Sequence, residues 1–183
     1  TVPSEGALPA QRAPLSRLGM GPWRGARDLI EPRSIFLLAL VALSYGVAAR
    51  LSLLFVLEPQ NVAGIWPPAG IALGALLLNP PRRWPVVVAG VAIAVGAANL
   101  AGAVPAGMTL GFIVATLAEP LLAAVLLRRA GFDSLATLRG VGLFLAIAAF
   151  GAPLVGGALG AATAAGSAGA PFLSTWVTWV LAD

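Results

Sequence analysis

The chain has 183 residues, of which 59% are apolar and only 10% are charged, and its formal net charge at pH 7 is +4. Soluble domains contain roughly 45–50% apolar and about 25% charged residues, and a soluble fold of this length has too little interior to bury so much apolar surface. With no Cys and no His, these residues cannot form a disulfide, an iron–sulfur cluster or the usual zinc, haem and triad sites, so we expect no metal, no cofactor and no enzymatic activity within this span.

Residues 1–33 differ from the rest of the chain. Prolines interrupt them, and five arginines charge them: Arg12, Arg17, Arg24, Arg27 and Arg33. This composition predicts a disordered, basic, cytoplasmic leader. A secretory signal peptide is the alternative, but the charged region is too long and no small-residue cleavage site follows a short apolar core. Because the chain opens at Thr1 and closes at Asp183 inside an apolar run, we expect it to be a fragment of a longer protein.

Six apolar runs follow the leader. They cover residues 34–57, 66–79, 84–100, 107–127, 140–165 and 172–183. A membrane-spanning helix needs about 20 residues, so the second run is short and the sixth is incomplete. Because each connection is too short for a separate domain, the pattern predicts one all-α polytopic membrane bundle over residues 34–183.

Arginine placement predicts the direction of the spans. After the leader, arginines occur between runs two and three (Arg82 and Arg83) and between runs four and five (Arg128, Arg129 and Arg139). The gaps at 58–65, 101–106 and 166–171 contain none. Basic residues in short loops stay cytoplasmic, so we expect a cytoplasmic N-terminus and three outward-facing gaps. No basic patch is contiguous enough to follow phosphates, so we expect no nucleic-acid partner.

Ionisable side chains inside the apolar runs are costly in hydrocarbon and are therefore candidate functional residues. Three qualify: Arg50, Glu119 and Asp183. The alternatives are that Arg50 extends to the outer headgroups, that Glu119 is a protonated carboxyl bonded to a neighbouring helix, and that Asp183 is a polar helix end. We expect Glu119 to form a buried network with Asp183. A direct ion pair between Glu119 and Arg50 is disfavoured. At a helical rise of about 1.5 Å per residue, their depths in the membrane differ by more than about 10 Å.

Two prolines lie inside apolar runs. Pro120 follows Glu119 and leaves the Thr116 carbonyl without its usual partner, and a kink beside an acid suits a ligand or proton site. Pro153 frees the carbonyl of Ala149 in the same way. For Pro153 we favour a simple bend, since prolines are common in membrane helices.

Glycines four residues apart predict close helix contacts, because small residues allow backbones to approach where lipid gives no hydrophobic drive. Three such pairs occur. They are Gly70 with Gly74, Gly107 with Gly111, and Gly156 with Gly160. Random occurrence is the alternative in a chain with 22 glycines.

The most specific string is residues 61–73, Asn-Val-Ala-Gly-Ile-Trp-Pro-Pro-Ala-Gly-Ile-Ala-Leu. From the residues alone, it predicts an outer loop, then Trp66 at headgroup level, then Pro67 and Pro68 in the first helical turn, where missing donors do no harm. We expect these three residues to shape the outward end of the second helix and to line the sensing surface.

The same string resembles the signature of the first family of bacterial membrane-associated sensor domains (the MASE class), in which Trp-Pro-Pro-Ala-Gly opens the second helix. The likeness covers residues 34–183 and includes Trp84-Pro85, Asn99-Leu100, Glu119 with Leu121-Leu122, Arg128-Arg129, Phe172, Trp176, Trp179 and Asp183. We therefore add Asn99 to the candidate sensing residues. The chain departs from the family pattern at Ala182, where Gly is expected, and at Pro120, where a small or helix-forming residue is commoner.

The resemblance implies a sensory module in a bacterial inner membrane, usually of about eight helices, ahead of a cytoplasmic histidine kinase, diguanylate cyclase or related output domain. The expected partners are the bilayer, an unknown small-molecule or membrane-state signal, the output domain in cis and a second copy in a homodimer. A secondary transporter is the main alternative, because a short Pro/Gly-broken helix and a buried acid resemble a midplane substrate site. A purely structural anchor is the third.

Overall fold

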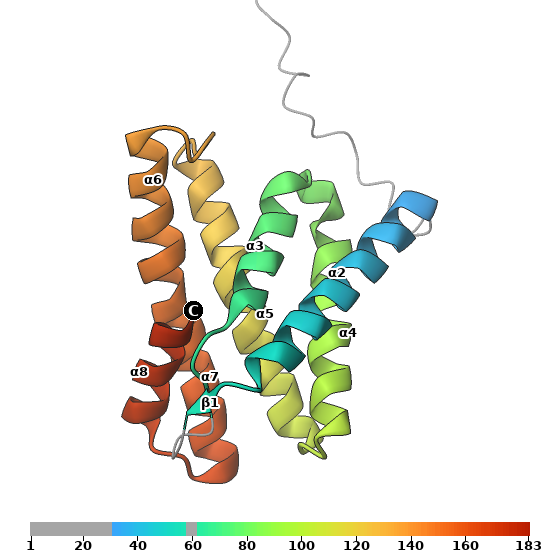
Figure 1. Ribbon diagram of the computed structural model, residues 1–183, viewed down its shortest axis with the longest axis vertical. Coiled ribbons are helices and arrows are strands. Elements are labelled where there is room, and N and C mark those ends of the chain that lie inside the picture. The colour runs from blue at the N-terminus through green and yellow to red at the C-terminus, as the bar shows by residue number, and fades with distance from the viewer. Residues whose placement is uncertain (1–30, 58–61) are drawn as a thin grey trace, which may run out of the picture.

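The computed structural model describes residues 31–57 and 62–183, so nearly all of the predicted leader lies outside the described residues. Helices joined by short connections make up most of the described chain (Figure 1). They are α2 Pro32–Ser52, α3 Pro67–Leu78, α4 Trp84–Ala101, α5 Ala106–Arg129, α6 Leu138–Phe144, α7 Ala152–Ala168 and α8 Phe172–Ala182, with a 3-10 turn η2 at Pro81–Arg83 and a π-helix η3 at Leu145–Gly151.

Four helical segments of the described chain are long and apolar enough to cross a membrane. They are α2, η2 with α4, α5, and the continuous α6–η3–α7 segment over residues 138–168. Helix α3 is apolar but has only 12 residues, too few to span alone, and α8 is an apolar helix of 11 residues. The prediction of a multi-pass helical membrane protein is confirmed, and the second run forms a short helix, as its length had indicated.

The first apolar run does not stay helical to residue 57, as the sequence had indicated. The Leu54 N–H donates to the Leu51 carbonyl, and the Phe55 N–H donates to the Ser52 carbonyl. These bonds span three residues instead of four, so the last turn tightens and α2 ends. Strand β1, Val56–Leu57, then pairs antiparallel with β2, Val62–Ala63. This pairing satisfies backbone donors and acceptors where the chain turns back toward α3.

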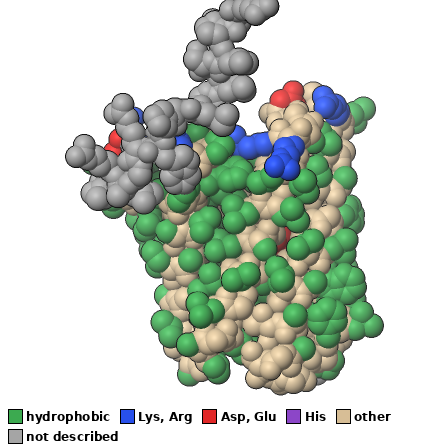
Figure 2. All heavy atoms as spheres, turned by 180° about the vertical axis from the view of Figure 1, so that it is seen from behind, with side chains coloured by type: hydrophobic (Ala, Val, Ile, Leu, Met, Phe, Trp, Pro, Cys, Tyr) green, Lys and Arg blue, Asp and Glu red, His purple; other side chains and the backbone are tan. Residues whose placement is uncertain are grey.

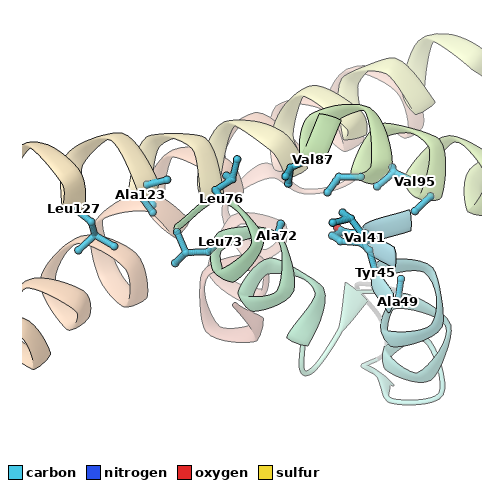
Figure 3. Packing of buried hydrophobic residues seen from close by; sticks show 14 residues of the cluster. Val41, Tyr45, Ala49, Ala72, Leu73, Leu76, Val87, Val95, Ala123 and Leu127 are labelled. Carbon is cyan, nitrogen blue, oxygen red and sulfur yellow. The ribbon is translucent and has the colours of Figure 1, made fainter. Parts of the chain in front are cut away.

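The helices pack into one bundle around a shared core. Helix α5 packs against α7, α4 and α3, while α2 packs against α4 and α3. Figure 3 shows the buried side chains of the core, which come from α2, α3, α4 and α5 and, at Ala152, from α7. Large apolar side chains also cover the outside, such as Leu43, Val114 and Phe150, and apolar atoms dominate the side of the bundle in Figure 2. A water-exposed protein rarely shows so large an apolar surface, whereas lipid covers it at little cost.

Arginine side chains gather at one end of the bundle, which we call the arginine end (Figure 2). Arg128 donates hydrogen bonds to the carbonyls of Leu76, Leu77 and Asn79 at 3.2, 3.1 and 2.8 Å. Its guanidinium also lies 5.3 Å from the Trp84 ring centroid. The last carbonyls of α3, which have no partners within their own helix, are therefore satisfied by a cation from α5.

The start of α3 and the residues at Ala182 of α8 meet inside the bundle. The backbone N–H of Trp66, just before α3, donates to the Ala182 carbonyl at the end of α8 at 2.8 Å. Figure 1 shows the end of α8, marked C, near mid-height, where α3 begins. Pro67 and Pro68 have no N–H, and the Ala69 N–H bonds to the Trp66 carbonyl at 3.2 Å. Helix α3 can therefore start away from water without unpaired donors at its first residues.

A seven-residue π-helix, η3, joins α6 to α7 and ends two residues before Pro153. The Ala152 N–H bonds to the Ile147 carbonyl, five residues back. Because Pro153 cannot donate to Ala149, the hydrogen-bond register shifts rather than breaks. The expected bend at Pro153 is thus taken up by a change of helix type.

Candidate functional site

A cavity of about 210 Å³ lies where α8 and α3 meet. It is bounded by α2, α4, α5 and α8 and by the residues around the start of α3. Its lining residues are Tyr45, Ala49, Leu53, Trp66, Val95, Ala98, Asn99, Phe112, Thr116, Trp179, Ala182 and Asp183. The cavity lies beside the contact between Trp66, at the start of α3, and Ala182 of α8.

Three polar atoms in the cavity wall are buried and lack hydrogen-bond partners. They are the Tyr45 hydroxyl, the Asn99 side-chain nitrogen and Oδ1 of Asp183, and no other unpartnered buried side-chain nitrogen or oxygen occurs in the described residues. The Trp66 indole and Thr116 hydroxyl approach the Tyr45 hydroxyl without completing a hydrogen bond. Leaving one such group unsatisfied costs roughly 1–3 kcal/mol. Their concentration at one cavity indicates a place where another molecule completes the bonding.

A pair of acids adjoins the cavity. The carboxyl groups of Glu119 and Asp183 lie within hydrogen-bonding range of each other, and the Trp179 indole faces Asp183. Glu119 is only 6% exposed. Two ionised carboxylates in contact repel each other strongly in a low-dielectric interior, so this arrangement requires a shared proton or a cation. The structure therefore places the expected acid pair together.

The tight fit around this pair depends on Gly156 and Gly160 of α7. A methyl group added at Gly156 would lie 2.7 Å from Cβ and Oε2 of Glu119. One added at Gly160 would overlap the Trp179 ring, and one at Gly111 would overlap Thr163. By contrast, one at Gly70, Gly74 or Gly107 would meet no atom within 4 Å, so the described residues make no close contact at those three glycines and their packing role stays a prediction.

The structure separates the remaining predicted site residues. Asn99 and Trp66 line the cavity, and Trp66 packs partly buried against the core, so it does not occupy the outer surface that a headgroup position would require. Pro67 is exposed and Pro68 is buried, and neither is a lining residue. Their effect on the site is indirect, through the start of α3.

Arg50 does not join the acid pair. It lies exposed in the last turn of α2, whereas Glu119 is buried in α5. Helix α2 packs against α3 and α4, on the other side of the core from α7. Arg50 does not line the cavity either, which agrees with the alternative that its side chain extends outward.

Among the polar and aromatic lining residues, sequence reasoning did not select Tyr45, Phe112, Thr116 or Trp179 as site residues, although it had noted Trp179 through the resemblance and Thr116 through its carbonyl. Tyr45 carried a usable signal. It is the only tyrosine in the chain, it lies within an apolar run, and it is fully buried. A buried tyrosine hydroxyl normally needs a partner, so counting hydroxyls as well as ionisable groups would have selected it.

The described cavity wall contains no basic side chain, and the described residues contain no group of three or more potential metal-ligating His, Cys, Asp or Glu side chains. What the wall offers is one carboxylate with a second acid behind it, an amide, the hydroxyls of Tyr45 and Thr116, and several aromatic rings. The rings of Phe112 and Trp179 lie 6.0 Å apart between centroids. This arrangement can hold a small molecule by hydrogen bonds and aromatic contact.

The fold and the cavity define a multi-pass helical membrane protein with a partly open, mostly apolar cavity that contains a few polar groups. A comparison with protein-family models matches residues 37–183 to MASE1, a membrane-associated sensor domain. The chain therefore belongs to the MASE1 family, which confirms the resemblance found in its motifs. This family is non-catalytic and typical of bacterial signalling proteins. Comparisons with curated proteins and with solved structures give no significant match.

Proposed function

We propose that this domain is the sensory input region of a bacterial signalling protein and that its cavity receives the signal. In this proposal it lies in the inner membrane with the arginine end in the cytoplasm, and it controls a histidine kinase, diguanylate cyclase or related output domain in cis. The observation that carries the proposal is the clustering of all three unpartnered buried side-chain atoms of the described residues at one cavity.

The geometry suggests how a ligand would act. Asp183 and Ala182 line the cavity at the end of α8, and α8 packs along α7. A ligand that completes the bonding of Asp183 favours one position of the α8 end over another. The difference in ligand affinity between the two positions determines how far the populations of the two shift. The segment that follows α8 then passes this shift to the output domain.

The test compares single hydroxyl deletions on one helix in the full-length gene product. Tyr45→Phe removes the unpartnered cavity hydroxyl. The matched control, Ser44→Ala, removes a hydroxyl that bonds to the Leu40 carbonyl at 2.7 Å and does not line the cavity. We expect the output activity at matched abundance to change in Tyr45→Phe and Asn99→Leu but not in Ser44→Ala. Equal output in all four proteins would contradict a sensory role for the cavity and would favour a structural anchor.

One observation also favours a secondary transporter. A short helix that begins with two prolines inside a bundle, beside an acid-lined cavity, resembles the broken helices of transporter substrate sites. The membership in a sensor family weighs against this function. Counterflow uptake into proteoliposomes separates the two, since a sensor binds its ligand without moving it across the membrane.

A further inference from the structure

We propose that the cavity binds a small organic ammonium ion, with at least one N–H group and an apolar body about the size of one aromatic ring. This inference rests on the proposed function, because it names the chemical class of the signal. It is carried by the charge, the aromatic walls, the unmet hydrogen bonds and the size of the cavity.

The charge of the cavity lining determines whether a cation or an anion can bind. The lining residues include Asp183 and no basic residue, and Glu119 faces Asp183 from behind the wall. An anion entering this space would meet a carboxylate with no cation to offset it, away from bulk water. A monocation instead balances the single negative charge that remains when the two acids share one proton.

The aromatic walls select an organic cation over a bare metal ion. Trp66, Phe112, Trp179 and Tyr45 supply rings on several sides, and ring faces attract cations while their surfaces also accept apolar groups. A hard metal ion would need about six oxygen ligands. The described residues contain no cluster of three or more potential metal-ligating side chains, so such an ion would be poorly held.

The unpartnered atoms specify the hydrogen bonds. Oδ1 of Asp183 accepts from an ammonium N–H, and the Tyr45 hydroxyl can accept a second. The Asn99 amide carries both a donor and an acceptor, so it can serve a hydroxyl on the ligand body or a third N–H. A quaternary ammonium would leave Asp183 without a donor, which is why the proposal requires an N–H.

The cavity volume limits the body of the ligand. The space is about 210 Å³, and an engineered cavity of about 150 Å³ in another protein holds benzene. One ring with a short ammonium arm therefore fits. Larger ligands of drug size usually occupy roughly 300–1,000 Å³.

The experiment uses isothermal titration of the full-length protein in lipid nanodiscs with three probes of matched size: phenethylammonium, 2-phenylethanol and 3-phenylpropanoate. We expect saturable binding of phenethylammonium, at least about tenfold weaker binding of the alcohol, and none of the carboxylate. Empty nanodiscs correct for partition into lipid. Equal binding of the alcohol, binding of the carboxylate, or no binding of phenethylammonium would overturn the proposal.

Variants assign the binding to the cavity. Asp183→Asn should weaken phenethylammonium at least about tenfold, whereas Asp133→Asn, at an exposed acid outside the cavity, should leave it unchanged. Tyr45→Phe gives a second test if Asp183→Asn fails to fold. Unchanged affinity in the folded cavity variants would overturn the site.

The outcomes separate this inference from the proposed function. If cavity variants alter output but no ammonium probe binds, the sensory function stands and the ligand class is wrong. If phenethylammonium binds and depends on Asp183 while cavity variants leave output unchanged, the site stands and the sensory function is wrong.

Discussion

The arginine end and the cavity differ in how their polar groups are satisfied. At the arginine end, Arg128 bonds to three backbone carbonyls that α3 leaves free, and the Trp84 indole donates to the Leu76 carbonyl at 2.8 Å. Around the cavity, Tyr45, Asn99 and Asp183 keep polar atoms unpartnered. The comparison teaches that the chain itself satisfies the polar groups at the arginine end, whereas the three polar atoms at the cavity have no partner within the described residues.

The largest expected effect concerns the orientation of the bundle in the membrane, because each introduced thiol is either labelled or not labelled. The natural chain has no Cys, so Ser134→Cys and Ser167→Cys each introduce one thiol, the first at the arginine end and the second in the 166–171 gap. In cells with a permeabilised outer membrane, an impermeant thiol reagent should label Ser167→Cys only. Labelling of Ser134→Cys alone would reverse the topology and place the cavity half toward the cytoplasm.

Close packing behind the acid pair gives the next largest effect. A Cβ at Gly156 would lie 2.7 Å from two atoms of Glu119, whereas one at Gly74 would meet nothing within 4 Å. Gly156→Ala should lower the free energy of unfolding in micelles by about 1–3 kcal/mol. Gly74→Ala should leave it unchanged or raise it by about 0.5–1 kcal/mol, since alanine stabilises a helix interior. If Gly156→Ala is as stable as Gly74→Ala, Glu119 is not held against α7.

Loss of Arg128 should damage only the arginine end. Arg128→Ala removes three hydrogen bonds and the contact with Trp84, and we expect the free energy of unfolding to fall by about 1–2 kcal/mol, because the side chain is exposed and partly screened. Arg129→Ala is the matched control, an exposed neighbour. Affinity for phenethylammonium should not change in either variant. If Arg128→Ala weakened the affinity for phenethylammonium, the arginine end and the cavity would be coupled.

The smallest expected change in stability comes from removing the Tyr45 hydroxyl, and it tests directly whether this group lacks a partner within the protein. Tyr45→Phe removes a buried hydroxyl that has no partner, so the free energy of unfolding without ligand should stay the same or rise by up to about 1 kcal/mol. A typical buried substitution lowers it by about 1 kcal/mol or more. Thermal unfolding of both proteins without ligand measures the difference. A clear loss of stability would mean that the hydroxyl is bonded within the protein.

Helix positions were predictable because they follow from local composition. The apolar runs at 84–100 and 107–127 became α4 and α5 with bounds within two residues of the prediction. The end of α2 was missed because the apolar run continues through Val56 and Leu57, which pair as a strand instead. Composition carries no information on such pairing, because the same apolar residues suit either state.

The site was only partly predictable, for a different physical reason. Asp183, Glu119, Asn99 and Trp66 stood out as polar or motif residues, but the cavity depends on a contact between Trp66 and Ala182, far apart in sequence. No local pattern predicts that α8 contacts the start of α3. Likewise, spacing identified a small face at Gly70 and Gly74 without identifying a neighbour for it, and the described residues make no close contact there.

The bond between Trp66 and Ala182 also has a consequence for how the domain is made. During synthesis, the start of α3 leaves the ribosome long before the segment that supplies the Ala182 carbonyl. The two prolines that follow Trp66 remove the donors that would otherwise wait unpaired in lipid, so a single N–H is left for the late-arriving α8 to satisfy. The cavity therefore forms only after α8 has been made, and a chain interrupted before α8 would insert its long spans without forming it.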